Sequence, residues 1–142
     1  MSSYRPRRRF AQNFLVDREV IRSIIGLVRP KKGEVVVEIG PGRGALTNGL
    51  VAGLERLVAV EIDRELAAML RERLGAKGLH LIEGDILEVD LGQVLRDEGG
   101  DSLLIVGNLP YNITAPLIFH FLAQADHIDR AVIMVQREVA QR

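Results

Sequence analysis

The segment that most restricts the possible folds is a β-branched run that leads into three glycines at alternate positions. Residues 35–39 read Val-Val-Val-Glu-Ile, and Gly40, Gly42 and Gly44 follow before the helix-like segment 45–51. The run predicts a strand buried on both faces. Glycine lets the backbone turn sharply and approach a ligand closely. A strand, a glycine turn and a helix in this order open a nucleotide-binding unit.

The same alternation of strand and helix continues along the chain. Hydrophobic runs predict further strands at 57–62, 79–82, 103–106 and 131–135, and a helical period predicts a helix at 65–74. Such alternation is typical of an α/β fold, in which a parallel sheet carries helices on both faces. The signals over 86–94 are mixed, and the composition of 96–101 predicts a polar loop.

Two further helices are expected, one before the first strand and one before the last. Asp17 is a good N-cap for an amphipathic helix that ends at Pro30. Thr114 is expected to cap a second helix, with Pro116 in its first turn. Its inward-facing residues would be Leu117, Ile118, Phe121 and Leu122. A helix beginning at Arg137 is cut off by the chain end, so we expect an incomplete domain over 17–142 whose last strands are missing.

Composition excludes several classes of function. Lysine plus arginine and aspartate plus glutamate both number 19, so net charge indicates no polyanionic partner. Without cysteine, and with three scattered histidines, we expect no metal site. No apolar run is long enough to cross a membrane, and the basic start has no signal-peptide core. These features predict a cytoplasmic protein without a membrane partner.

Local charge is concentrated in residues 1–16, which we expect to form a basic N-terminal arm. Arg5, Arg7, Arg8 and Arg9 lie within five residues of one another. Such a cluster can contact RNA phosphates, although a solvated tail would have the same composition.

Two acids at expected strand ends accompany the glycine turn. Glu61 closes the second strand about 20 residues after the first glycine, where an acid can accept hydrogen bonds from ribose hydroxyls. Asp85 ends the third strand, where it can bind an adenine amine while the N–H of Ile86 reaches a ring nitrogen. The alternatives are that Glu61 caps the helix near Asp63 and that Asp85 is an ordinary turn residue.

The details of this set favour S-adenosylmethionine over a nicotinamide dinucleotide. The turn reads Gly-x-Gly-x-Gly, and Glu38 precedes it within the strand. A dinucleotide needs its pyrophosphate on a helix N-terminus. S-adenosylmethionine has no phosphate and needs acids and backbone groups for its sulfonium, ammonium and ribose.

Asn108-Leu109-Pro110-Tyr111 follows the fourth strand, at the edge where open α/β sheets bind ligands. The Asn108 amide oxygen and the Leu109 carbonyl can accept the two hydrogens of an adenine N6 amine, which would aim the nitrogen lone pair at a methyl donor. Pro110 would fix the loop, and Tyr111 would stack on a flipped base. The alternative is an asparagine turn beside a Pro-Tyr packing corner.

The chain resembles the ribosomal RNA adenine dimethyltransferases of the KsgA type, which have a Rossmann-like class I methyltransferase fold. The motifs that carry the resemblance are 12–15 (Gln-Asn-Phe-Leu), 37–42, 60–63, 84–85, 107–113 and 134–140. The resemblance implies that Asn13 and Leu15 close over the cofactor and that Gly40, Glu61, Asp85 and Asn108 contact it.

The resemblance also implies a substrate: two adjacent adenines in a 3′-terminal hairpin of small-subunit ribosomal RNA in the pre-30S particle, each methylated twice at N6. It further implies a C-terminal helical domain that this sequence lacks, so the activity of the chain by itself is open. Two other hypotheses stay open: a dinucleotide-dependent oxidoreductase domain, and a ribosome-assembly module or inactive fragment that binds without methylating.

Overall fold

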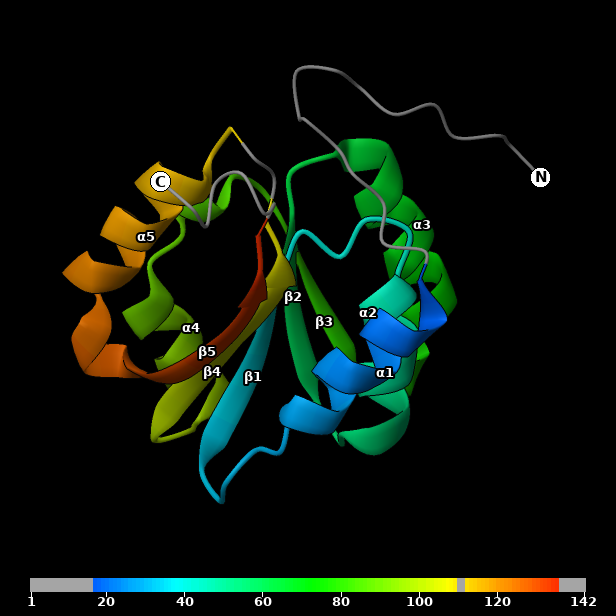
Figure 1. The fold of residues 1–142 in the computed structure, drawn as a ribbon, viewed down its shortest axis with the longest axis horizontal. Coiled ribbons are helices and arrows are strands. Elements are labelled where there is room, and N and C mark those ends of the chain that lie inside the picture. The colour runs from blue at the N-terminus through cyan, green and yellow to red at the C-terminus, as the bar shows by residue number, and fades with distance from the viewer. Residues whose placement is uncertain (1–16, 110–111, 136–142) are drawn as a thin grey trace.

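The computed structural model describes residues 17–109 and 112–135, which form one sheet with helices on both faces (Figure 1). All strand pairs are parallel, and the strand order is β3-β2-β1-β4-β5. The strands are β1 (Glu34–Ile39), β2 (Leu57–Glu61), β3 (Leu79–Glu83), β4 (Ser102–Asn108) and β5 (Ile128–Met134). The helices are α1 (Arg18–Leu27), α2 (Ala45–Gly53), α3 (Arg64–Leu74), α4 (Leu91–Glu98) and α5 (Thr114–Ala123). The expected α/β architecture is confirmed.

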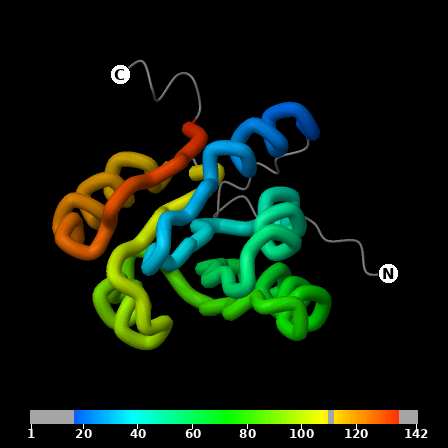
Figure 2. Tube along the Cα trace, turned by 90° about the horizontal axis from the view of Figure 1, so that it is seen from below, coloured from blue at the N-terminus to red at the C-terminus, as the bar shows by residue number. Residues whose placement is uncertain are grey.

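The helices divide between the two faces according to the strands that they connect. Helices α1, α2 and α3 cover one face, and α4 and α5 cover the other (Figures 1 and 2). Alternate residues of the central strands supply the two cores, so Val36 packs under α2 and α3 while Val37 packs on the opposite side. Strands buried on both faces explain the β-branched runs in the sequence.

Helix α1 begins after Asp17, as predicted, and helix α3 also begins after an aspartate. Asp17 accepts the N–H groups of Glu19 at 2.9 Å and Val20 at 3.3 Å, and it begins α1. Asp63 caps α3 in the same way, accepting from Glu65 at 2.9 Å. Such caps satisfy N–H groups that a helix leaves unpaired at its first turn.

The prediction of a polar loop over 96–101 was wrong in its first half, because α4 extends to Glu98. Asp90 caps this helix, and Leu91, Val94 and Leu95 are buried against the sheet. A short helix of this kind is stabilised by tertiary packing more than by its own propensity, which is why composition concealed it.

Three expectations for the C-terminal part also need correction. Thr114 is the first residue of α5 and Ile113 is its N-cap, so Thr114 does not cap the helix. Leu117 is buried, as expected, but Ile118 is 42% and Leu122 is 65% exposed. Because α5 is apolar nearly all round, the periodicity could not select one buried face. Strand β5 begins at Ile128, three residues before the expected start at 131.

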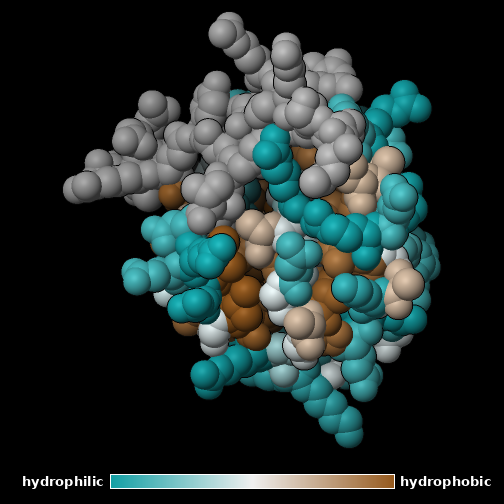
Figure 3. All heavy atoms as spheres, turned by 90° about the vertical axis from the view of Figure 1, so that its right-hand side faces the viewer, coloured by the Kyte–Doolittle hydropathy of each residue, from teal (hydrophilic) through white to brown (hydrophobic). Residues whose placement is uncertain are grey.

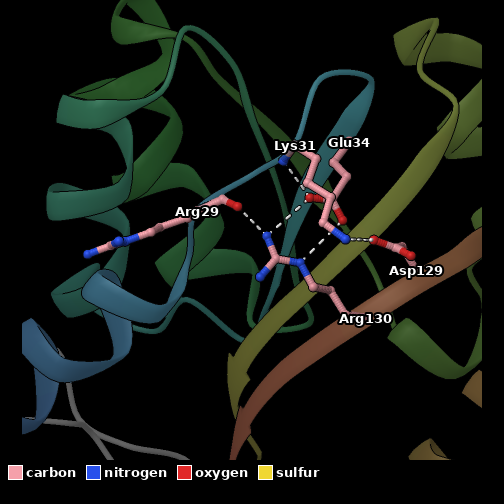
Figure 4. Close-up of polar contacts among 5 residues, drawn as sticks. All are labelled: Arg29, Lys31, Glu34, Asp129 and Arg130. Carbon is pink, nitrogen blue, oxygen red and sulfur yellow. Dashed lines mark hydrogen bonds and ion pairs between the residues drawn. The ribbon is translucent and has the colours of Figure 1, made fainter.

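An ion pair fastens the strands together at the amino edge of the sheet, where they begin (Figure 4). The Arg130 guanidinium of β5 donates to both carboxylate oxygens of Glu34 in β1, at 3.1 and 3.3 Å. Glu34 also accepts the Lys31 N–H at 2.6 Å, and Arg130 donates to the Arg29 carbonyl. The contacts between Arg130 and Glu34 join residues 96 positions apart in the sequence.

The outer surface over α1, α2 and α3 is largely polar, with hydrophobic side chains showing between the polar ones (Figure 3). Among the described residues, no helix has both the length and the apolar character needed to cross a membrane.

Candidate functional site at the carboxyl edge of the sheet

The strand order places its topological switch point between β1 and β4, at the centre of the sheet. The helix after β1 packs on one face and the helix after β4 packs on the other, so the connections diverge at the carboxyl edge, at the top of Figure 1. Open α/β sheets bind ligands at such points. Gly40 and Asn108 directly follow the paired residues Ile39 and Gly107 here.

Backbone hydrogen bonds bring the predicted residues of neighbouring strands side by side. The Gly40 N–H donates to the Val60 carbonyl at 2.9 Å, and the Gly84 N–H donates to the Glu61 carbonyl at 2.9 Å. Gly40, Glu61, Asp85 and Asn108 therefore lie along one edge of the sheet, as the sequence predicted.

The glycine turn leaves space on the side where a ligand would approach. Gly40 and Gly42 have φ angles of 63° and 60°, a region that favours glycine. Among the described residues, a Cβ built on Gly40 meets no atom within 4 Å, whereas one on Gly44 would lie 3.0 Å from Leu70. No described residue therefore fills the space beside Gly40, while Gly44 permits close packing of the turn on α3.

Glu61 is buried, with 4% of its surface exposed, and its carboxylate is held at the tip of β2. One oxygen accepts the Gly42 N–H at 3.0 Å, and the other accepts the Asp63 N–H at 2.9 Å. A carboxylate has about four lone-pair sites, so it retains capacity for ribose hydroxyls. Burial raises the pKa of Glu61, against the lowering effect of the two N–H donors. Asp63, and not Glu61, is the N-cap of α3.

Asp85 is half-buried at the end of β3 and caps a short 3-10 turn, Ile86–Glu88. One carboxylate oxygen accepts the Leu87 N–H at 2.9 Å. The N–H groups at the start of a helical turn have no acceptor within it, so the Ile86 N–H is directed away from the turn. This cap is what an ordinary turn aspartate would make. The second carboxylate oxygen of Asp85 and the Ile86 N–H are the groups that could bind an adenine.

Asn108 is the last residue of β4 and is half-buried beside the glycine turn. Leu109 is buried, and its N–H donates to the Met134 carbonyl of β5 at 2.9 Å, which fixes the peptide after Asn108. Gly107 allows this arrangement, because a Cβ there would lie 2.7 Å from the Ile39 carbonyl oxygen.

Beneath the glycine turn lies a pair whose contact sequence reasoning missed. Glu38 of β1 is 2% exposed, and Thr47 of α2 is completely buried and donates its hydroxyl to the Glu38 carboxyl at 2.7 Å. Burial raises the pKa of Glu38 to about 8, the Thr47 hydrogen bond opposes this rise, and the negative charge of Glu61 adds to it. A Thr that follows Ala45 and Leu46 in a predicted helix gives no sign of such a contact.

Several predicted residues lie outside the described part of the chain. They are Asn13, Leu15, Pro110, Tyr111 and the arginines at 5, 7, 8 and 9. The boundary between an arm at 1–16 and a domain at 17–142 also stays a prediction. Within residues 17–109 and 112–135, no three His, Cys, Asp or Glu side chains are placed to hold a metal ion.

Residues 4–142 match the family model described as ribosomal RNA adenine dimethylase. The chain belongs to the ribosomal RNA adenine dimethylase family. Relatives of this family named ribosomal RNA small subunit methyltransferase A include one from Nitrosospira multiformis, 48% identical over 96% of this chain, and one from Bordetella petrii, 47% identical over 100%. The chain spans 51% and 52% of their lengths.

Solved structures with the same architecture include two methyl-group-transferring enzymes. The 23S rRNA methyltransferase ErmE has a TM-score of 0.75 and 30% identity, with 91% of this chain and 50% of ErmE covered. A dimethyladenosine transferase from Plasmodium falciparum has a TM-score of 0.75 and 28% identity, with 92% and 46% covered. The fold is therefore the Rossmann-like class I fold of S-adenosylmethionine-dependent methyltransferases, as the resemblance implied.

Proposed function

We propose that this chain is the S-adenosylmethionine-binding part of an enzyme that methylates N6 of two adjacent adenines in a 3′-terminal hairpin of small-subunit ribosomal RNA. The observation that carries the proposal is the meeting of Gly40, Glu61, Asp85 and Asn108 at one sheet edge, in a chain of the ribosomal RNA adenine dimethylase family. When bound, S-adenosylmethionine supplies an electrophilic methyl group on a positively charged sulfur.

The acids divide the recognition of the cofactor between them. Glu61 accepts hydrogen bonds from the ribose hydroxyls, because its carboxylate is already oriented by Gly42 and Asp63. Asp85 accepts a hydrogen bond from the adenine amine, and the Ile86 N–H donates to the ring. Gly40 lets the ligand approach the backbone, and Asn13 and Leu15 close over it.

Asn108 and Leu109 orient the adenine amine that is methylated. The lone pair of this amine is delocalised into the ring, so the nitrogen is a poor nucleophile until it becomes pyramidal. The Asn108 amide oxygen and the Leu109 carbonyl each accept one N6–H, which orients the lone pair and stabilises the positive charge that develops on nitrogen. Tyr111 stacks on the flipped base and Pro110 fixes the loop. The methylated amine then releases its proton to water, so no general base is needed.

The macromolecular partner in this proposal is the pre-30S particle. The named relatives modify ribosomal RNA of the small subunit, which supports an RNA substrate. Arg5, Arg7, Arg8 and Arg9 would contact phosphates without reading sequence. A cytoplasmic location, expected from the sequence, belongs to the same proposal.

Calorimetric titration of the chain with S-adenosylmethionine, S-adenosylhomocysteine and NAD tests the cofactor assignment. We expect both adenosyl ligands to bind and NAD not to bind. Binding of NAD alone would refute the proposal in favour of an oxidoreductase domain. Adenosyl binding without methyl transfer to small-subunit particles would favour the assembly module or inactive fragment.

Asn108→Ala tests the catalytic step separately. We expect methyl transfer to fall by about 100-fold or more, since a lost transition-state acceptor has effects of this size, while cofactor affinity changes little. Asn48→Ala is the matched control, because Asn48 is exposed on α2. An unchanged transfer rate in Asn108→Ala would contradict the role assigned to the amide.

A further inference from the structure

Glu38 is a buried titratable group to which the proposed mechanism gives no role. Its side chain lies on the face of β1 that α2 covers, two residues before Gly40, and Thr47 in the first turn of α2 donates to it at 2.7 Å. This hydrogen bond joins the strand before the glycine turn to the helix after it. The turn is therefore built directly over the Glu38 carboxyl.

No described Lys, Arg or His side chain pairs with the Glu38 carboxyl. Helix α2 and strand β4 contain no Asp, Glu, Lys, Arg or His, and β2 contributes only the acid Glu61, which Asp63 follows. The arginines of α3, on the same face, make contacts elsewhere: Arg64 with Glu83, Arg71 with the Leu81 carbonyl and Arg73 with the Arg43 carbonyl. Those of α1, Arg18 and Arg22, are exposed. A carboxyl buried among apolar and acidic groups favours its neutral form.

The position of Glu38 places it within electrostatic reach of a ligand bound beside Gly40. Two residues along a strand separate the two backbones by about 7 Å. At such a distance inside a protein, an opposite charge lowers a carboxyl pKa by about 1 to 2. Because burial raises the pKa of Glu38 to about 8, a change of this size moves the group across neutral pH.

We propose that Glu38 senses the charge of the cofactor, staying neutral while the carboxyl edge holds no cation near Gly40 and ionising when a sulfonium ligand binds there. The inference rests on the proposed function, because it takes S-adenosylmethionine as the ligand. The product, S-adenosylhomocysteine, keeps the ribose and the ammonium but has an uncharged sulfur. Glu38 thereby favours the methyl donor over the product, and it takes up a proton again after transfer.

A proton-counting calorimetric titration tests this inference. The ligands are S-adenosylmethionine, S-adenosylhomocysteine and sinefungin, which carries a protonated amine in place of the sulfonium methyl, each at pH 7.5 in buffers of different ionisation enthalpy. We expect S-adenosylmethionine and sinefungin to release about half a proton more than S-adenosylhomocysteine. Protons released by Glu61 on binding the ribose cancel in this difference.

The charge difference between S-adenosylmethionine and S-adenosylhomocysteine should also make the ratio of their affinities depend on pH. The ratio of S-adenosylmethionine to S-adenosylhomocysteine affinity should rise about tenfold between pH 6.5 and 8.5, because the cation binds the ionised form of Glu38 more tightly. In Glu38→Gln, which copies the neutral form, both the pH dependence of this ratio and the differential proton release should disappear. Glu98→Gln is the control: Glu98 is a buried carboxyl that pairs with Arg56 and His80, and its substitution should leave the differential release intact.

Equal proton release by S-adenosylmethionine and S-adenosylhomocysteine in the wild type, or a difference that persists in Glu38→Gln, would overturn the inference while leaving the proposed function standing. If S-adenosylmethionine or S-adenosylhomocysteine failed to bind, both this inference and the proposed function would be overturned. Thr47→Val gives a second test that keeps the carboxyl. Loss of its hydroxyl donor should move the differential release to higher pH, and an unmoved pH range would also contradict the inference.

Discussion

Strand β1 has two glutamates four residues apart on the same face, and their surroundings at the two ends of the strand shift their pKa values in opposite directions. At the amino edge, burial would raise the pKa of Glu34, but hydrogen bonds from Arg130 and Lys31 prevail and lower it to about 2. At the carboxyl edge, the described residues offer Glu38 a threonine hydroxyl and a second acid, and burial raises its pKa to about 8. The amino edge pairs its acid with a cation of β5, whereas no described cation pairs with the acid at the carboxyl edge.

The largest effect expected from this contrast concerns stability at the carboxyl edge. A pKa raised from 4.5 to about 8 means that the folded chain holds a proton that the unfolded chain releases, so the free energy of unfolding falls as pH rises from 4.5 to about 8. Glu38→Gln should remove this loss and stabilise the protein at pH 8 by about 3 to 5 kcal/mol. Urea denaturation between pH 5 and 8.5 measures it, and parallel profiles for variant and wild type would contradict it.

The next effect concerns ligand binding at the same edge. Glu61→Gln should weaken S-adenosylhomocysteine binding by about 100-fold, because neutral amide groups replace a carboxylate that accepts from both ribose hydroxyls. Glu34→Gln, at the amino edge, should leave this affinity unchanged within about twofold. Calorimetry measures the S-adenosylhomocysteine affinity of both variants. Equal weakening by the two substitutions would contradict the expected difference between the two edges.

A smaller effect is expected for the stability of the amino edge. Glu34→Gln should lower the free energy of unfolding at pH 7 by about 1 to 3 kcal/mol, since it weakens a charged hydrogen bond to Arg130. A lowered pKa contributes stability that is present above 4.5 and lost as pH falls toward about 2. Denaturation of the wild type and Glu34→Gln should therefore converge in acid, and a gap that persists at pH 2 would contradict this assignment.

The smallest expected effect separates the two interpretations of Asp85. Asparagine caps a helical turn about as well as aspartate, so Asp85→Asn should change stability by less than about 0.5 kcal/mol. If Asp85 also binds the adenine amine, S-adenosylhomocysteine affinity should fall by about tenfold. Unchanged affinity would leave Asp85 with only its capping role, in which it accepts the Leu87 N–H.

The sequence predicts the central strands well because β1, β2 and β4 each contain an uninterrupted hydrophobic run of three or more residues. It predicts the polar edge equally well, since parallel topology brings the residues after each strand to one side, as seen for Gly40 and Asn108. Where helices depend on tertiary burial, prediction failed: α4 was taken in part for a loop, and the buried face of α5 was only partly identified.

The contacts that distinguish the two ends of β1 could not be predicted. Arg130 contacts Glu34 although the two residues lie 96 positions apart in the sequence. No local sequence pattern indicates which charged residues will form such a pair. The opposite pKa changes of Glu34 and Glu38 depend on those contacts and on burial, and both follow from the assembled sheet.

A crystal structure of the chain with S-adenosylhomocysteine tests the central claim most directly. We predict that both ribose hydroxyls lie within about 2.6–3.2 Å of the Glu61 carboxylate, with the adenine between Asp85 and Ile86 and the sulfur near Gly40 and Asn108. A ligand bound away from the carboxyl edge, or an Asn108 side chain turned away from the ligand sulfur, would contradict it.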